Sequence, residues 1–253
     1  MKILCGIALA LTSLLLSFNA DCTTLEVKAK YWMPKFESDV RVDENGIRGT
    51  VIDIEEDLGI DTDEEGAIPI EVTLNLGRIL GLWFSYTNIE LEGRAMVSDQ
   101  FVFAGNTFTI NADIESTLEF STMEGGLELD LIPTEIIELG PCASGIYFDG
   151  KATITDINSS ISAEGTLSTV VPAFGAFARI NLLNDNLQIS GRWLGMTYGD
   201  DDYSDLVVEG KYNILANIGV VAGYRRVTVD VQEDNVFVDT ELSGFFVGAA
   251  ISF

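Results

Sequence analysis

The last stretch of the chain, residues 243–253, constrains the fold more than any other segment. Every second residue back from the end is apolar, namely Phe253, Ile251, Ala249, Val247 and Phe245. The residues between them are smaller or more polar, apart from Phe246. A period of two is the pattern of a β-strand whose two faces meet different surroundings. The chain therefore ends in a strand with one apolar face, which must belong to a sheet with an apolar side.

The composition combines a large negative charge with a large apolar fraction. The 253 residues include 40 acidic and 14 basic side chains and no histidine, for a formal charge of -26. This balance argues against a nucleic-acid partner, because phosphate contacts need clustered lysine and arginine. Since 47% of the residues are hydrophobic and the mean hydropathy is +0.25, the chain is also too apolar to stay disordered. Charge and apolar surface must be segregated, as in a barrel with lipid-facing walls and acidic loops.

The N-terminal 20 residues have the pattern of a secretory signal. Lys2 precedes an apolar run over residues 3–18, which is shorter than the roughly 20 residues of a membrane helix. We expect residues 1–20 to be a signal peptide and residues 21–253 to form one exported domain. No later stretch is long and apolar enough for a membrane helix, so a membrane location would require strands. Removal of the signal leaves Cys22 and Cys142, and a disulfide, free thiols and lipidation of Cys22 all stay open.

Alternating segments separated by turn residues predict ten strands. In residues 68–76 the side chains of Ile68, Ile70, Val72, Leu74 and Leu76 face one way and polar ones face the other. Short turns are expected at residues 77–80, 132–135, 183–186 and 215–217. Loops are expected at residues 43–66, 98–106, 157–165, 199–202 and 233–235. We predict an all-β fold, a closed antiparallel transmembrane up-and-down β-barrel of ten strands, with eight strands as the alternative.

The expected strand over residues 107–131 changes the phase of its alternation. Leu118 and Phe120 belong to one phase, whereas Met123, Leu127 and Leu129 belong to the other. One extra residue in a strand has this effect, so we expect a β-bulge between Phe120 and Met123.

Six charged residues lie on the faces opposite the apolar ones, each within a few residues of a short turn. They are Glu71, Arg179, Arg192, Glu209, Lys211 and Arg225. Because an unpaired buried charge is costly, we expect acid–base pairing in the lumen. The pairs would either fill a narrow barrel or line a small aqueous pore, and we favour a packed or very narrow lumen. An interfacial girdle or loop packing is expected for the aromatic residues Trp83, Phe101, Phe103, Tyr198, Tyr203 and Phe237.

Several motifs carry a resemblance to a known group of proteins. Gly248, Ile251 and Phe253 have the spacing of the C-terminal signal by which the outer-membrane assembly machinery recognises its clients, although Phe246 replaces a usual polar residue. The segments 54–59, 145–148 and 223–226 are similar to those of proteobacterial outer-membrane β-barrels of the small OmpA/OmpX-like kind, a mostly uncharacterised set. The resemblance implies export through the periplasm to a Gram-negative cell outer membrane. It also implies membrane lipids, lipopolysaccharide and the assembly machinery as partners, and it implies no reaction.

The missing histidine argues against catalysis. Outer-membrane enzymes such as omptin-like proteases, lipid A acylases and phospholipase resemble one another in needing a catalytic histidine, and this chain has none to act as a base. We expect no enzymatic activity and no cofactor. Asp61, Asp63 and Glu65 are similar to the start of a calcium loop, but Val72 stands where the bidentate acid would be needed. We therefore predict no dedicated metal site, and loose binding of divalent cations by the acidic loops stays open.

Three functions remain. The favoured one is an integral outer-membrane barrel with acidic extracellular loops and a structural or surface-interaction role. The second is a narrow, porin-like diffusion channel for small solutes, with the lumen charges selecting by sign. The third is a secreted soluble barrel of the lipocalin type that binds an apolar ligand. Glu71, Arg179, Arg192 and Lys211 argue against the third, because they lie on the face that would line its apolar pocket.

Overall fold

The computed structural model describes residues 23–253 except 45, 61–65, 133, 135, 160, 184, 185, 200 and 234. The expected signal peptide over residues 1–20, and Cys22, lie outside the described residues. Within the described part the regular secondary structure consists of β-strands. No helix that is long and apolar enough to cross a membrane occurs among the described residues.

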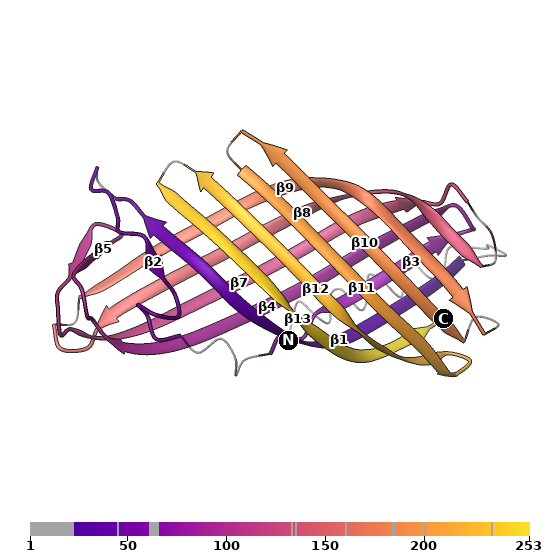
Figure 1. Ribbon diagram of the computed structural model, residues 1–253, viewed down its shortest axis with the longest axis horizontal. Coiled ribbons are helices and arrows are strands. Elements are labelled where there is room, and N and C mark those ends of the chain that lie inside the picture. Colours follow the sequence, from indigo (N-terminus) through magenta and orange to yellow (C-terminus); the bar gives the residue numbers. More distant parts are fainter. Residues whose placement is uncertain are drawn as a thin grey trace, which may run out of the picture.

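Ten strands form one closed antiparallel barrel (Figure 1). They are β1 (Thr23–Val42), β3 (Ile70–Leu76), β4 (Leu80–Met96), β7 (Asp113–Leu129), β8 (Ile137–Asp156), β9 (Ser162–Leu182), β10 (Leu187–Tyr198), β11 (Asp201–Leu215), β12 (Ile218–Glu233) and β13 (Val236–Ser252). Each strand pairs with the next one along the chain, and β13 pairs with β1 from Val236 to Ser252. The predicted ten-stranded barrel is therefore confirmed, and the alternative of eight strands is wrong.

The start of β1 and the end of β13 lie at the end of the barrel that carries the short turns. Thr23 pairs with Leu76 beside the β3–β4 turn, and the backbone N–H of Phe253 donates to the carbonyl oxygen of Leu25. In bacterial barrels the short turns face the periplasm and the longer loops face the outside. We therefore call the end with the short turns the periplasmic end and the end with the longer loops the extracellular end.

The barrel wall reverses its polarity between the two ends. Near the short turns the outward side chains are apolar and exposed, as at Phe174 and Val247, and the inward ones are polar or charged. Nearer the extracellular end Ile114 and Ile154 point inward and are buried, while Glu115 points outward and is exposed. The apolar outer belt fits a membrane, and the extracellular half resembles a water-soluble barrel with an apolar core.

This reversal explains the phase change in β7. The strand pairs with β4 and with β8 in continuous register from one end to the other, so the predicted β-bulge is wrong. Leu118 and Phe120 point into the apolar core, whereas Met123 and Leu127 point outward into the belt. The surroundings of the strand change along its length, and its backbone alternation does not.

The β10–β11 hairpin is shorter than its neighbours. Strand β10 pairs with β9 from Phe174 to Leu182, so residues 162–173 of β9 pair with β8 alone. Strand β11 pairs with β12 up to Asp202 and Asp230. Figure 1 shows β8 and β9 running on past the tip of this hairpin. Pro172 lies where β9 leaves β10, which suits a residue without an N–H group to donate to a neighbouring strand.

A small hairpin covers the extracellular end. It consists of β5 (Phe101–Phe103) and β6 (Asn106–Phe108), which pair with each other, so residues 106–108 do not belong to the long strand predicted over 107–131. The rings of Phe101 and Phe108 stack at 5.0 Å. The backbone N–H of Ala104 donates to the carbonyl oxygen of Val42, which ties the hairpin to the end of β1. The remaining short strand, β2 (Ile52–Asp53), pairs with β1.

Candidate functional site: a charge cluster in the barrel lumen

Ten charged side chains form one connected set of ion pairs in the periplasmic half of the lumen. We call this set the lumen charge cluster. Its acidic members are Glu26, Glu71, Glu128, Glu138 and Glu209, and its basic members are Lys28, Lys30, Arg179, Arg192 and Lys211. Five negative and five positive charges cancel, which removes the largest obstacle to burying them together.

The centre of the cluster joins three barrel strands. Glu209 on β11 accepts a hydrogen bond from Lys28 on β1 at 2.7 Å, and its other oxygen lies 2.8 Å from the ammonium of Lys30. Glu71 on β3 lies 3.3 Å from Lys28 and 3.4 Å from Lys30. Strand alternation brings Lys28 and Lys30 to the same face of β1, so two carboxylates and two ammonium groups alternate in space.

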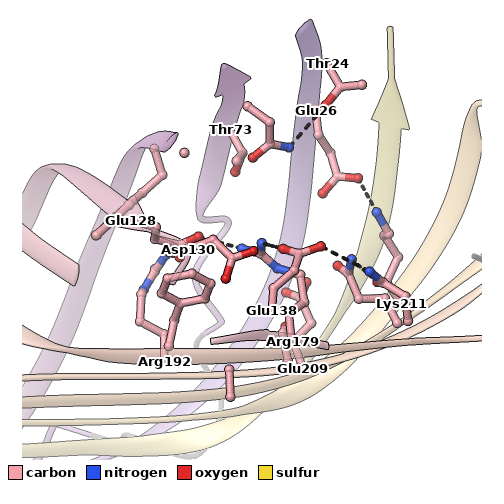
Figure 2. A pocket seen from close by; sticks show the side chains of 18 of the residues that line it. Thr24, Glu26, Thr73, Glu128, Asp130, Glu138, Arg179, Arg192, Glu209 and Lys211 are labelled. Carbon is pink, nitrogen blue, oxygen red and sulfur yellow. Dashed lines mark hydrogen bonds and ion pairs between the residues drawn. The ribbon is translucent and has the colours of Figure 1, made fainter. Parts of the chain in front are cut away.

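Two arginines and a lysine extend the cluster around the wall. Arg179 donates to Glu128 at 2.6 Å and also to Glu138. Arg192 lies 3.8 Å from Glu128 and 3.8 Å from Glu71, so it links Arg179 and its carboxylates to the centre of the cluster. On the other side Lys211 donates to Glu26 (Figure 2). The planar guanidinium group can hold two carboxylates at once, and the geometry of Arg179 uses this property.

The structure places five of the six predicted lumen residues in this cluster, namely Glu71, Arg179, Arg192, Glu209 and Lys211. The sixth, Arg225, also points into the lumen but pairs with Asp205, at 2.8 and 3.2 Å. The prediction missed five members, Glu26, Lys28, Lys30, Glu128 and Glu138. A signal for three of them was present, because Glu26, Lys28 and Lys30 alternate with less polar residues at the start of β1.

Aromatic rings pack against two cations of the cluster. The guanidinium of Arg192 lies 4.4 Å from the ring centroid of Trp83, and the ammonium of Lys30 lies 4.9 Å from that of Phe246. Both distances are within the range of cation–π attraction. The girdle or loop position expected for Trp83 is therefore wrong, since this side chain is buried in the lumen. Phe246, the apolar exception in the last strand, thus packs against a buried cation of the cluster.

The same correction applies to Tyr203. It is buried inside the barrel, with its ring 5.8 Å from that of Phe148 in an edge-to-face arrangement. Phe101 and Phe103 pack in the extracellular loops as expected. Tyr198 is exposed at the end of β10, and Phe237 lies against Arg41 at the extracellular end of the β1–β13 pair.

A cavity of about 600 Å³ lies on the periplasmic side of the lumen, bounded by cluster residues and by the β3–β4 turn at residues 77–79. Its wall carries both signs of charge, as Figure 2 shows for Glu128, Arg192 and Lys211. Beyond the cluster the described lumen is filled by buried side chains, among them Trp32 and Leu242, apart from small cavities. The described residues contain no group of acidic or sulfur ligands that could hold a metal ion, and Asp61, Asp63 and Glu65 lie outside them.

The remaining predicted residues lie at the seam of the barrel. Ile251 and Phe253 of the expected assembly signal point outward and are exposed. Gly248 packs closely against β1, where a β-carbon would lie 2.2 Å from the carbonyl oxygen of Ala29. Cys142 is a buried free thiol, and its possible partner Cys22 lies outside the described residues.

Comparisons with known proteins bear on the fold. No protein-family model matches this sequence, and no curated protein matches it significantly. Among solved structures, the outer membrane protease OmpT from Escherichia coli is similar with a TM-score of 0.59 at 11% identity, covering 94% of this chain and 98% of that chain. Ail, the attachment invasion locus protein of Yersinia pestis, matches at a TM-score of 0.38 and 14% identity, covering 92% of this chain and 99% of that one. The likeness to OmpT shows that the chain has the fold of outer-membrane β-barrels, in agreement with the predicted outer-membrane location.

Proposed function

We propose that the protein is an integral outer-membrane barrel that conducts no solute and presents an acidic surface to partners outside the cell. The observation that carries this proposal is the packing of the lumen beyond the periplasmic cavity. Ion pairs span the periplasmic half, the rings of Trp83 and Phe246 pack against their cations, and buried apolar side chains occupy the extracellular half. A solute would have to displace both layers, and separating the buried ion pairs would be costly.

The outer surface supports the second half of the proposal. Five aspartates face one another across five neighbouring strands, in the order Asp53, Asp39, Asp239, Asp230 and Asp202. Like charges directly opposite in a sheet are destabilising, so the repulsion along this row opposes folding. A surface of this kind fits cationic partners, or divalent cations that bridge it to the phosphates of lipopolysaccharide.

Conductance in a planar lipid bilayer tests the closed lumen. The refolded protein, checked by the gel shift between cold and boiled samples, should give no discrete current steps. Arg192→Ala should also stay silent, because the apolar half of the lumen remains filled. Current steps in the wild type whose ion preference changes in Arg192→Ala would contradict the proposal.

The charged periplasmic cavity favours a narrow channel as the second candidate function. In that case the apolar half would have to rearrange, and discrete current steps would appear in the wild type above a threshold voltage. The same recordings therefore distinguish the two candidates.

Binding to the refolded protein in neutral vesicles tests the surface role. Fluorescent oligolysine should bind, and the quadruple variant Asp39→Asn, Asp202→Asn, Asp230→Asn, Asp239→Asn should lower the affinity at low salt. Equal binding by wild type and variant would refute a role for the aspartate row. We also propose that the protein is not an enzyme, because it has no histidine to act as a base near neutral pH.

A further inference from the structure

The periplasmic cavity of about 600 Å³ has the size of a small-molecule site, for which volumes of about 300–1,000 Å³ are usual. Residues of the periplasmic turns, among them Gly77 and Thr134, form one boundary, and the packed lumen lies beyond the other. Amide side chains, such as those of Asn75, Asn181 and Gln188, line the wall beside the charges. A molecule that enters from the periplasm would therefore be held in this cavity and not passed on.

Two hydrogen-bond donors on this wall lack an acceptor. Nε of Arg192 and Nε1 of Trp83 are buried and have no hydrogen-bond partner among the described residues. The ion pairs of Arg192 with Glu71 and Glu128 are both 3.8 Å long, which is beyond hydrogen-bond range. Because the guanidinium lies 4.4 Å from the Trp83 ring, the two residues form one corner of the cavity. A buried donor without an acceptor is costly, and a carboxylate is the acceptor that suits a guanidinium group best.

An acceptor on the same wall lacks a donor. Asp130 is 7% exposed, and its Oδ1 accepts the backbone N–H groups of Ile132 at 2.9 Å and Leu139 at 3.1 Å. Its Oδ2 is buried and has no hydrogen-bond partner in the described part of the chain. Asp130 follows Glu128, the ion-pair partner of Arg192, by two residues, or about 7 Å of extended chain. Figure 2 shows Asp130 and Arg192 among the side chains that line the cavity.

We propose that this cavity binds a small zwitterion from the periplasm, whose carboxylate accepts hydrogen bonds from Arg192 and Trp83 and whose ammonium group donates to Asp130. The described lining carries acidic and basic side chains in equal number, which favours a ligand with both signs of charge over one with a net charge. A free amino acid and a short peptide share this chemistry. The binding goes beyond the closed lumen and the acidic surface proposed above, because it requires neither conduction nor a partner outside the cell.

Calorimetry on the folded protein in lipid nanodiscs, which leave both ends of the barrel accessible, tests the inference. Glycine and triglycine are the zwitterionic probes. Each is compared with its N-acetylated form, which lacks the ammonium group, and with its amide, which lacks the carboxylate. At least one zwitterion should bind, and both of its blocked forms should bind roughly tenfold more weakly, because each loses a hydrogen bond between charged groups. Tighter binding of glycine would assign the site to a free amino acid, and tighter binding of triglycine would assign it to a short peptide.

Two substitutions each remove one half of the site. Asp130→Asn keeps an oxygen for the two backbone N–H groups and removes the charge, so the zwitterion should bind roughly tenfold more weakly while the N-acetylated form binds the variant and the wild type alike. Trp83→Phe keeps a ring against Arg192 and removes the indole N–H, so it should weaken the zwitterion and leave the amide unaffected. Asp149→Asn, which removes a charge from the exposed outer wall, should bind the zwitterion as the wild type does.

The gel shift between cold and boiled samples checks that each variant is folded. If a variant does not fold, the blocked probes on the wild type still decide the question. Absence of binding by both zwitterions would overturn the proposal, and so would blocked forms that bind the wild type as tightly as the zwitterion.

Discussion

At the residue scale, burial decides how much each charge contributes to stability. The side chain of Glu209 is 3% exposed and touches two lysines, whereas the equally short pair between Arg226 and Glu241 lies on the outer surface. Breaking a buried pair from one side leaves its partner uncompensated, while an exposed pair is replaced by water. The two carboxylates, on strands β11 and β13 on either side of β12, therefore provide a matched comparison.

Glu209→Gln should lower the free energy of unfolding by roughly 3 kcal/mol, because the variant leaves a net positive charge in the cluster. Glu241→Gln should lower it by less than about 1 kcal/mol. Urea unfolding of the refolded protein in lipid vesicles, followed by tryptophan fluorescence, measures both. Similar unfolding midpoints for the two variants would show that water screens the cluster.

Asp39 on the extracellular surface should give stability an unusual pH dependence. Burial raises the pKa of its carboxyl, and the carboxylates of Asp53, Asp239 and Asp57 raise it further. The folded protein then holds this proton more tightly than the unfolded chain does, so stability falls as pH rises from the ordinary to the raised pKa. Asp39→Asn should be more stable than wild type at neutral pH, and the gain should vanish below the ordinary carboxyl pKa.

Asp113 provides a control, because the pKa of its carboxyl is shifted in the opposite direction. A hydrogen bond from Arg94 lowers the pKa of the Asp113 carboxyl. The ionised carboxylate therefore stabilises the fold above the ordinary pKa, and this stabilisation is lost as the pH falls through the lowered pKa. Asp113→Asn should therefore reduce stability at neutral pH. Unfolding midpoints across a pH series distinguish the two cases, and curves for Asp39→Asn that run parallel to wild type would refute the effect of the aspartate row.

At the element scale, the seam between β1 and β13 depends on glycine. A β-carbon at Gly248 would lie 2.2 Å from the carbonyl oxygen of Ala29, whereas at Gly210 on β11 the nearest atom would be 3.9 Å away. Gly248→Ala should cost about 1–3 kcal/mol by forcing the two strands apart. Gly210→Ala should change stability by less than about 0.5 kcal/mol. Unfolding in urea measures both, and an equally tolerated alanine at Gly248 would show that the seam can widen.

Elements of this barrel could be predicted from the sequence because each membrane-crossing strand alternates over many residues. The alternation could not show which face meets water, and so the change at Phe120 in β7 suggested a bulge. The phase of the apolar residues changes because the outside of the barrel wall faces lipid on one side of Phe120 and water on the other, which only the assembled barrel reveals. The partners in the lumen were hidden for a similar reason. Lys28 and Glu209 are 181 positions apart, and the alternation of each strand says nothing about which strand lies across from it.

At the scale of the whole molecule, the pairing of β13 with β1 closes the barrel, and the last residue continues that pairing. The N–H of Phe253 donates to the carbonyl oxygen of Leu25, and the N–H of Leu25 donates back to Phe253. The ring of Phe253 is 69% exposed and so is that of Phe245 on the same face of β13. The two rings differ in one respect, since Phe253 belongs to the predicted assembly signal with Gly248 and Ile251, and Phe245 does not.

Phe253→Ala should therefore separate assembly from stability. The variant keeps both backbone hydrogen bonds of the seam, so its unfolding midpoint after refolding should match that of Phe245→Ala. In cells that export the protein, Phe253→Ala should reduce the heat-shifting, folded band in the outer-membrane fraction severalfold, whereas Phe245→Ala should not. Equal assembly of the two variants would mean that the C-terminal ring contributes to lipid contact alone, and that the machinery recognises another part of the chain.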